Sequence, residues 1–424
     1  MYLERQPLCR NEALKAGAIV LVCVLFLVAS AGAKPVPITG PVVITEPGQY
    51  YLANNILDST EPVCILVQTS NVVIDGRGKT IDGTDAPDSI GIRVYNAAMT
   101  LVNVVIKNIK VNDWNIGILL TDVRDSVIDR ATVTSCNLDG IRLFNSHWNT
   151  VQNSVSRNNG GAGFLLFGGS SGNMVQGVTG QANGNDGIRI FQANNNDVQK
   201  SKFIGNARGG INLNDVSDFN SLGLNTLTGN MYGILMQKSS NNIIISNTIK
   251  DNEHGIYVYS DSINNKITKN TVTNCDSDGL RLLTGTDSNV VAGNTFDKNG
   301  RYGIYITEGD RNIMYNNLVR NNVNAGITMR SSEKNVFFNN YFYNVNNTDI
   351  IATTSYANVW NLSLSEQRSI TSGKYSGGNS WGQPNGQGFS QVTPDTNRDG
   401  ICDSPFPIAA NNIDNYPLKW KSVR

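Results

Sequence analysis

A glycine followed by alternating apolar and polar residues recurs along most of the chain. Eleven such glycines stand 22 to 26 residues apart, at Gly91, Gly117, Gly140, Gly163, Gly187, Gly210, Gly233, Gly255, Gly279, Gly303 and Gly326. The first and third residues after each glycine are apolar, and the second and fourth are mostly polar or aromatic. This period of two is typical of a short strand with one buried face. Self-similarity at a period of about 23 residues predicts a solenoid.

Asparagines mark two further points of each repeat. The first set precedes an apolar residue, at Asn149, Asn173, Asn196, Asn220, Asn242, Asn265, Asn289, Asn312 and Asn335. The second set is Asn153, Asn225, Asn247, Asn270, Asn294, Asn316 and Asn339. Asparagine tolerates left-handed turns, and stacked amides can hydrogen-bond from one coil to the next. The pattern therefore predicts three short strands per repeat, separated by Asn- and Gly-bearing turns, as in a parallel β-helix.

The sequence resembles the right-handed β-helix repeat proteins of the NosD-like group, whose repeat is also called the carbohydrate-binding and sugar-hydrolase β-helix. The matching parts are Tyr50-Tyr51-Leu52 through residues 71–78, the repeats, and the tail segments 377–381 and 414–418. The resemblance implies an all-β, single-stranded right-handed parallel β-helix. About 12–13 coils, stacked about 4.8 Å apart, would give a rod roughly 60 Å long. Lyases, hydrolases, epimerases, adhesins and inert surface proteins all share this repeat.

The amino terminus predicts an export signal. Basic residues precede an apolar run over 16–28, and Ala31-Gly32-Ala33 fits a cleavage site, so residues 1–33 form the signal. An uncleaved membrane anchor is the alternative. Since the ends of a solenoid must be covered, we expect a cap and first coil over 34–70, repeats over 71–347 and a C-terminal cap over 348–424. We expect a secreted or cell-surface protein, periplasmic in a cell with two membranes, without a transmembrane domain once the signal is removed.

Charge and cysteine content narrow the function classes. Lysine plus arginine and aspartate plus glutamate both number 34, which argues against a nucleic-acid partner. Cys136 and Cys275 take the same repeat position six coils apart, about 29 Å, which is beyond disulfide reach. Together with Cys64 and Cys402 they are expected to be buried thiols. The NosD-like resemblance implies copper delivery, but the two His and the Cys and Met residues are dispersed, which disfavours a copper site.

The polar positions of the glycine-marked strand carry arginines and aromatic residues. We expect a carbohydrate-binding face comprising Arg93, Tyr95, Arg142, Phe144, Arg189, Phe191, Tyr257, Tyr259 and Tyr305. Aromatic rings stack on sugars and arginine pairs with uronate carboxylates. Packing among exposed neighbours, or contact with another surface protein, would explain the same pattern.

Three aspartates stand directly before repeat glycines, each with an arginine three residues later. They are Asp139, Asp186 and Asp278, which are candidates for acid–base catalysis. Asp139 and Asp186 would lie two coils, or about 10 Å, apart, slightly beyond the range of inverting glycosidases. The favoured interpretation is that aspartate suits the turn before glycine. His254 has the same position before Gly255, and we expect it to be an exposed turn residue.

The segment from Asp395 to Asp403 resembles a calcium loop. Oxygen ligands would come from Asp395, Asn397, Asp399 and Asp403 and from the carbonyl of Ile401, with Gly400 at the sharp turn. Phe406 replaces the usual bidentate glutamate. A structural calcium ion in the C-terminal cap is expected; a metal-free turn is the alternative.

The sequence thus favours a secreted or cell-surface module that binds a polysaccharide or surface glycan, or that acts as a structural or adhesive protein, without catalysis. The alternative is a lyase, hydrolase or epimerase acting on uronate-type polymers. A NosD-like copper-accessory role ranks third.

Overall fold

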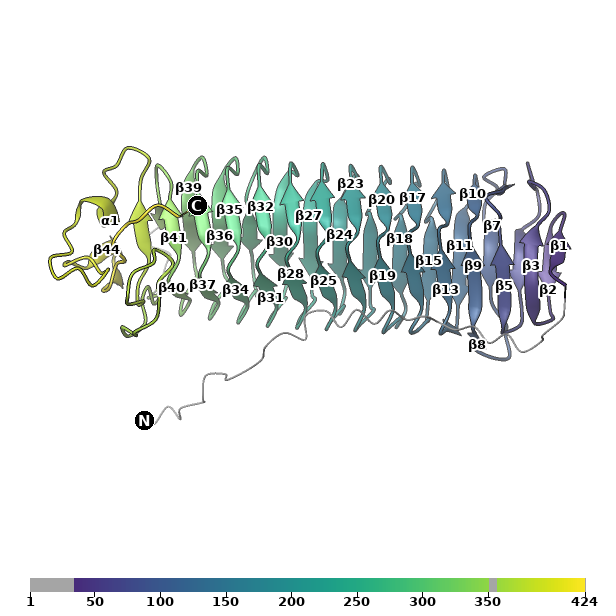
Figure 1. Ribbon diagram of the computed structural model, residues 1–424, viewed down its shortest axis with the longest axis horizontal. Helices are drawn as coiled ribbons and strands as arrows, with labels where there is room; N and C mark the ends of the chain where they lie inside the picture. Colours follow the sequence, from purple (N-terminus) through teal and green to yellow (C-terminus); the bar gives the residue numbers. More distant parts are fainter. Residues whose placement is uncertain (1–33, 351–356, 424) are drawn as a thin grey trace. The chain divides into compact units, whose positions relative to one another are not determined.

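The computed structural model describes residues 34–350 and 357–423, which form one compact unit, Lys34–Arg424, built as a long stack of coils (Figure 1). The predicted signal over 1–33 lies outside the described residues. Three parallel sheets of 14, 14 and 13 strands run along the stack. The chain makes about 13 turns, so the predicted all-β solenoid is confirmed. Among the described residues, no helix has the length and apolar character needed to cross a membrane.

Sheet A contains the strand that follows the first asparagine marker. Its 14 strands are, in spatial order, β1 (Val36–Ile38), β3 (Gly48–Leu52), β5 (Val72–Asp75), β9 (Val104–Lys107), β13 (Val127–Asp129), β16 (Thr150–Gln152), β19 (Met174–Gln176), β22 (Asp197–Gln199), β25 (Ser221–Gly223), β28 (Ile243–Ile245), β31 (Lys266–Thr268), β34 (Val290–Ala292), β37 (Ile313–Tyr315) and β40 (Val336–Phe338).

Sheet C comes next in each coil. Its 13 strands are β6 (Thr80–Asp82), β10 (Lys110–Asn112), β14 (Thr132–Thr134), β17 (Val155–Arg157), β20 (Thr179–Gln181), β23 (Lys202–Ile204), β26 (Thr226–Thr228), β29 (Thr248–Lys250), β32 (Thr271–Thr273), β35 (Thr295–Asp297), β38 (Leu318–Arg320), β41 (Tyr341–Tyr343) and β43 (Ser380–Gly382).

Sheet B contains the glycine-marked strands and completes the coil. Its 14 strands are β2 (Val42–Ile44), β4 (Val63–Val67), β7 (Ile90–Val94), β11 (Ile116–Thr121), β15 (Ile141–Phe144), β18 (Phe164–Phe167), β21 (Ile188–Phe191), β24 (Gly209–Asn214), β27 (Tyr232–Gln237), β30 (His254–Tyr259), β33 (Leu280–Leu282), β36 (Tyr302–Thr307), β39 (Ala325–Arg330) and β42 (Thr348–Ile350). Small extra pairs are β8 (Leu101–Val102) with β12 (Val123–Arg124), and β44 (Phe406–Ala409) with β45 (Asn412–Asp414).

The core is a continuous column of apolar side chains inside the coils. Each coil contributes the first and third residues after its glycine, such as Ile188 and Ile190, and one residue from each other strand, such as Val198 and Phe203. The repeat glycines let the coils close tightly on this core. A Cβ added at Gly187 would lie 2.7 Å from the carbonyl oxygen of Gly210 in the next coil and 2.7 Å from the Phe203 ring. A side chain therefore does not fit at this position.

Buried asparagines form ladders along the three turns of the coil. In the first ladder, the Asn173 Nδ2 donates to the Asn196 Oδ1 of the next coil at 3.0 Å, and the predicted set Asn149 to Asn335 is confirmed. In the second ladder, Asn225, Asn247, Asn270 and Asn294 also behave as predicted. A third ladder, which the sequence analysis missed, includes Asn159, Asn183, Asn206 and Asn230.

Three members predicted for the second ladder are wrong by one position. The side chains of Ser154, Asn317 and Asn340 take part in the ladder, rather than those of Asn153, Asn316 and Asn339. The residues predicted instead have positive φ, between 50° and 56°, which turns their side chains out of the ladder. Asparagine suits both the positive-φ position and the hydrogen-bonding ladder position of such a turn. The sequence alone therefore does not show which of two neighbouring residues takes which position.

The C-terminal end is closed by aromatic packing over the last coil. The ring of Phe337 stacks on that of Trp360 at 4.3 Å between centroids, and Phe342 stacks on Trp381 at 4.7 Å. Asp414 Oδ2 accepts hydrogen bonds from the Asn379 backbone at 2.8 Å and from Trp381 Nε1 at 2.9 Å. The short helix α1 (Phe389–Val392) lies in this segment. At the other end, regular strands start at Val36, within the range expected for the N-terminal cap.

The four described cysteines are buried free thiols, as predicted for Cys64, Cys136, Cys275 and Cys402. Burial raises the pKa of the Cys64, Cys136 and Cys275 thiols to about 12. These thiols therefore serve as small core side chains.

Candidate functional site

The outward side of sheet B, called here the sheet B outer face, carries three columns of side chains. The central column is formed by the second residue after each glycine, and strand pairing aligns Arg93, Leu119, Arg142, Leu165 and Arg189 in it. A distal column contains the fourth residue, as in Phe144, Phe167 and Phe191. A proximal column contains the residue before each glycine, where Tyr232 pairs with His254.

All nine residues predicted for carbohydrate binding lie in the central or distal column. Arg142 and Phe144 are on β15, Arg189 and Phe191 on β21, Tyr257 and Tyr259 on β30, Tyr305 on β36, Arg93 on β7 and Tyr95 directly after β7. Their exposure differs widely: Phe144 is 37% exposed, whereas Tyr305 is only 8% exposed. The structure thus places the predicted residues along one face but over about ten coils, too far apart for a single compact pocket.

The arginines of the central column lie against aromatic rings. The guanidinium carbon of Arg93 is 4.6 Å from the centre of the Tyr95 ring, and that of Arg189 is 4.9 Å from the Phe191 ring. Arg281 contacts two rings, Tyr305 at 4.6 Å and Tyr257 at 5.4 Å. Such cation–π contacts hold each guanidinium in a defined orientation.

The three candidate catalytic aspartates bind the backbone of the following coil. Asp139 Oδ1 accepts the Ala162 N–H at 2.7 Å while its Oδ2 accepts the Nε of Arg142 at 2.8 Å. Asp186 likewise accepts the Gly209 N–H at 2.8 Å and the Asn212 amide at 3.0 Å. Burial raises the pKa of Asp186, against the lowering effects of the Asn212 and Gly209 hydrogen bonds and the nearby arginines. These contacts support a structural role for Asp139 and Asp186 in the turn.

Asp278 differs from the other two aspartates. Its Oδ1 accepts the Tyr302 N–H at 3.3 Å, and its Oδ2 faces Arg281 Nη1 at 3.5 Å without a hydrogen-bond partner. The side chain is fully buried, and burial raises the pKa of Asp278 while the charges of Arg281 and Arg301 oppose that shift.

His254 is not the exposed turn residue that the sequence predicted, since it is only 9% exposed. Its ring stacks on Tyr232 at 5.4 Å and meets the edge of Tyr257 at 5.2 Å. Its Nδ1 is buried without a hydrogen-bond partner. Burial, with further contributions from Arg281 and Arg301, lowers the pKa of His254 to about 4, so the imidazole is neutral at neutral pH.

His254, Asp278, Arg281 and the tyrosines 232, 257, 302 and 305 form what we call the histidine cluster. Sequence reasoning named His254 and Asp278 but missed Tyr232 and Tyr302, because strict alternation would turn the residue before the glycine inward. The chain breaks alternation at the glycine, so this residue faces outward beside the central column. The signal available in the sequence was the recurrence of polar and aromatic residues at that position.

The predicted calcium loop is closed by its own hydrogen bonds. The Asp395 carboxylate accepts the N–H groups of Asp399 at 3.1 Å and Gly400 at 3.0 Å, and Asp403 accepts the Thr396 N–H at 3.1 Å. Asn397 donates to Asp399, and Ile401 forms a bridge with Leu418. Within residues 34–350 and 357–423, no group of three or more His, Cys, Asp or Glu side chains is positioned to hold a metal ion. The calcium site therefore stays a prediction.

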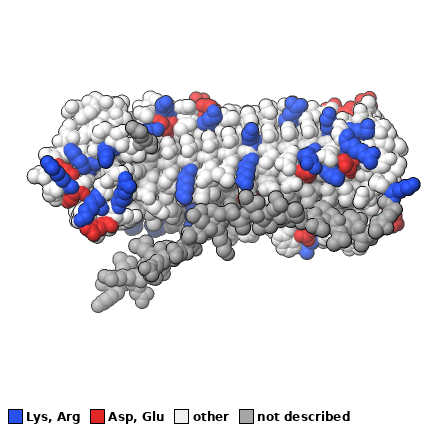
Figure 2. All heavy atoms as spheres, in the orientation of Figure 1, with Lys and Arg blue, Asp and Glu red and all other residues white. Residues whose placement is uncertain are grey.

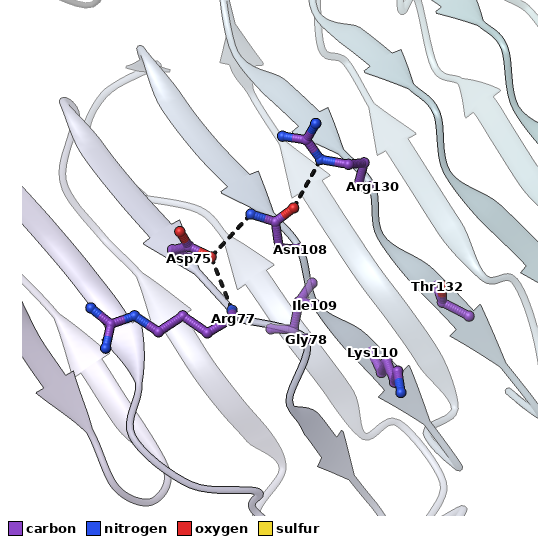
Figure 3. A pocket seen from close by; sticks show the side chains of 8 residues that line it. All are labelled: Asp75, Arg77, Gly78, Asn108, Ile109, Lys110, Arg130 and Thr132. Atoms are coloured by element: carbon purple, nitrogen blue, oxygen red, sulfur yellow. Dashed lines mark hydrogen bonds between the residues drawn. The ribbon is translucent and has the colours of Figure 1, made fainter.

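A shallow polar hollow lies at the turn between sheets A and C near the N-terminal end. Asn108 connects its two sides, donating to Asp75 at 3.2 Å and accepting from Arg130 Nε at 2.8 Å. The charged ends of Arg77, Lys110 and Arg130 point in different directions (Figure 3). Charged side chains are also scattered along the surface seen in Figure 2. The hollow therefore lacks the convergent groups of a binding site.

Comparison with solved structures finds proteins of similar fold. The A-module of the mannuronan C-5 epimerase AlgE6 from Azotobacter vinelandii aligns with a TM-score of 0.50 and 15% identity, covering 78% of this chain and 90% of that one. A double mutant of the periplasmic alginate epimerase AlgG gives 0.50 and 16% identity, covering 71% and 78%. At this identity the likeness shows the fold alone. No curated protein sequence matches.

The fold thus defines the chain as a right-handed parallel β-helix protein. A family described as a right-handed β-helix region matches residues 42–179 and 90–249. The family described as periplasmic copper-binding protein (NosD) matches residues 175–386, half of the chain. The chain belongs to this NosD family, and the resemblance noted from the sequence is confirmed.

Proposed function

We propose that this protein is an exported β-helix module that binds an extended polysaccharide along the sheet B outer face, without catalysis of its own. The observation that carries the proposal is the central column, in which arginines held against aromatic rings recur along a rigid surface. Aromatic faces and oriented guanidinium groups bind sugar rings and carboxylates. The periplasmic description of the family and the polysaccharide substrates named for the epimerases support an exterior location and this ligand class.

The test is binding of the mature chain to a glycan array, followed by calorimetry on the best ligand. Arg189→Gln and Phe191→Ala should each weaken binding at least tenfold, because each removes one half of a cation–π pair. Arg157→Gln, an exposed change at the end of β17 on sheet C, is the matched control and should leave affinity unchanged. Absence of binding to any glycan would contradict the proposal and favour a structural or protein-binding role.

A polysaccharide-modifying enzyme is the second candidate, favoured by the histidine cluster. Buried polar atoms without a hydrogen-bond partner, such as His254 Nδ1 and Asp278 Oδ2, destabilise the fold, and a catalytic role is one reason for which a protein keeps them. A neutral imidazole, tyrosine hydroxyls and an arginine are groups that proton abstraction from a uronate needs. An assay of uronate polymers for unsaturated products and for solvent hydrogen at C5 decides this point. Turnover lost in His254→Gln would establish the enzyme.

The methionine, histidine and cysteine residues of this chain do not favour the copper role of the NosD family. Met236, Met314 and Met329 are buried in the core, and Met99 is exposed. His147 and His254 lie on different coils, and the described thiols are buried. In the part of the chain that the structure describes, soft ligands therefore do not converge.

The calcium loop is proposed as a separate, structural site in the C-terminal cap. Calcium at millimolar concentration should raise the thermal unfolding midpoint of the wild-type protein but not of Asp399→Asn. Magnesium serves as the ion control. Equal midpoints with calcium and with a chelator would contradict the site.

A further inference from the structure

Three arginines of the central column, Arg93, Arg142 and Arg189, occupy every second coil. The aligned order is Leu66, Arg93, Leu119, Arg142, Leu165, Arg189, Asn212, Leu235, Tyr257, Arg281 and Tyr305. Arg281 follows Arg189 after four coils, which is twice the spacing of the earlier arginines. Leu235 stands midway between them, where the same spacing would place an arginine. Leucine stands between the first three arginines. Charge and apolar surface thus alternate along the helix axis from β7 to β21.

Strand spacing converts this order into distance. Neighbouring strands of a sheet lie about 4.8 Å apart, so arginines two coils apart present guanidinium groups about 10 Å apart. The register pairs are unbroken from β7 to β21, so the column has no slip over this stretch.

The guanidinium groups keep unused donors. The Nε atoms of Arg93, Arg189 and Arg281 are buried and have no hydrogen-bond partner. Arg142 gives its Nε and one Nη to Asp139, which fixes its position and leaves the other Nη. Because Arg93, Arg189 and Arg281 are only partly buried, the outer ends of their guanidinium groups can pair with an anionic ligand.

The leucines between the arginines are also fitted to a ligand. Leu119 and Leu165 are half-buried, and each lies between two arginines in register. They offer apolar contact for the face of a sugar ring and no group that could pair with a carboxylate. A polymer with an anionic group opposite every coil would place every second group against a leucine.

We propose that the ligand is an extended acidic polysaccharide with one carboxylate per disaccharide, lying along the helix axis over β7 to β21. This rests on the polysaccharide-binding function proposed above. In an extended, equatorially linked polysaccharide each pyranose advances by about one coil spacing, so alternate residues face successive arginines. The intervening neutral sugars face Leu119 and Leu165.

The test compares three octasaccharides of equal length by calorimetry: a hyaluronan fragment with alternating uronate and neutral sugar, a mannuronan fragment with a uronate at every residue, and a neutral chitin fragment. The alternating fragment should bind at least as tightly as the fully charged one, and the neutral fragment at least tenfold more weakly. Tighter binding of the fully charged fragment would overturn the spacing argument, because it would show that charge density alone sets affinity.

A phase-shifted variant keeps the net charge and changes only the spacing. Arg93→Leu combined with Leu119→Arg moves one guanidinium by a single coil. Arg93, unlike Arg142 and Arg281, forms no ion pair with a carboxylate among the described residues. Affinity for the alternating fragment should fall at least fivefold, while affinity for the fully charged fragment should change less than twofold. Thermal unfolding checks that both proteins fold alike.

If the double change destabilises the coil, Leu165→Gln gives a second measurement. It removes the apolar contact between Arg142 and Arg189 without moving charge, and it should weaken the alternating fragment more than the fully charged one. Unchanged affinities in both variants overturn the spacing inference while leaving polysaccharide binding intact. Failure of all three fragments to bind would instead contradict the proposed function.

Discussion

His254 lies between Tyr232 and Tyr257, with Arg281 and Arg301 close enough to oppose its protonation. A histidine with a pKa of about 4 is neutral in the folded protein and charged below pH 6.5 in the unfolded chain. Folding stability from this group is therefore fully present above pH 6.5 and is lost as the pH falls toward 4.

The expected result is an imidazole titration near pH 4, measured by nitrogen NMR. Arg281→Gln should raise the pKa of His254, since it removes a positive charge, whereas the exposed Arg330→Gln should not. The chain has two histidines, so His147→Gln assigns the signals. Titration of wild-type His254 near 6.5 would show that the imidazole is solvated.

At the scale of the element, the unit of stability is a turn ladder. Asn247 donates to the Leu222 carbonyl at 2.9 Å, and its Oδ1 accepts the Asn225 backbone N–H at 3.0 Å. Asn247→Ala leaves both backbone groups buried without partners, at a cost of about 1–3 kcal/mol for each. Thermal unfolding should show the loss.

Thr248→Ala is the matched control for the ladder, because Thr248 is the next residue and is exposed. It should change the free energy of unfolding by no more than about 0.5 kcal/mol. Equal effects of the two changes would mean that water replaces the ladder contacts.

The strands could be predicted from the sequence because two local features specify each of them. The apolar alternation after Gly187 and the absence of room for a Cβ at that glycine both specify the same strand. The histidine cluster did not follow, because it depends on a local break in alternation at Gly255 and on contacts between coils. The third ladder was also missed, since its members, such as Asn206, stand among many other asparagines.

At the scale of the whole molecule, the C-terminal cap makes folding stability depend on pH. Burial raises the pKa of Asp414 to about 7, against the hydrogen bonds donated by Asn379, Trp381 and Tyr416. The folded protein then keeps a proton that the unfolded chain releases above about pH 4. Stability from this group is full below that pH and falls as the pH rises through 7.

The unfolding midpoint of wild type should therefore fall between pH 5 and pH 8 more steeply than that of Asp414→Asn. Each unit of pKa difference corresponds to about 1.4 kcal/mol. Asp251→Asn, at an exposed position, should retain the wild-type slope. The difference between the slopes isolates Asp414 from His254, Asp186 and Asp278; identical slopes would contradict the raised pKa.

The ladders also determine how the molecule ages. Asn159, Asn183 and Asn299 are each followed by glycine, the sequence in which an asparagine side chain most readily cyclises and deamidates. In the third ladder these amides are buried and donate to the next coil at 2.9 Å. The side-chain carbonyl carbon is thereby held away from the backbone nitrogen that must attack it. Asn385, which is followed by Gly386 in the exposed cap, has no such protection. Deamidation is therefore expected to begin in the cap and not in the ladders.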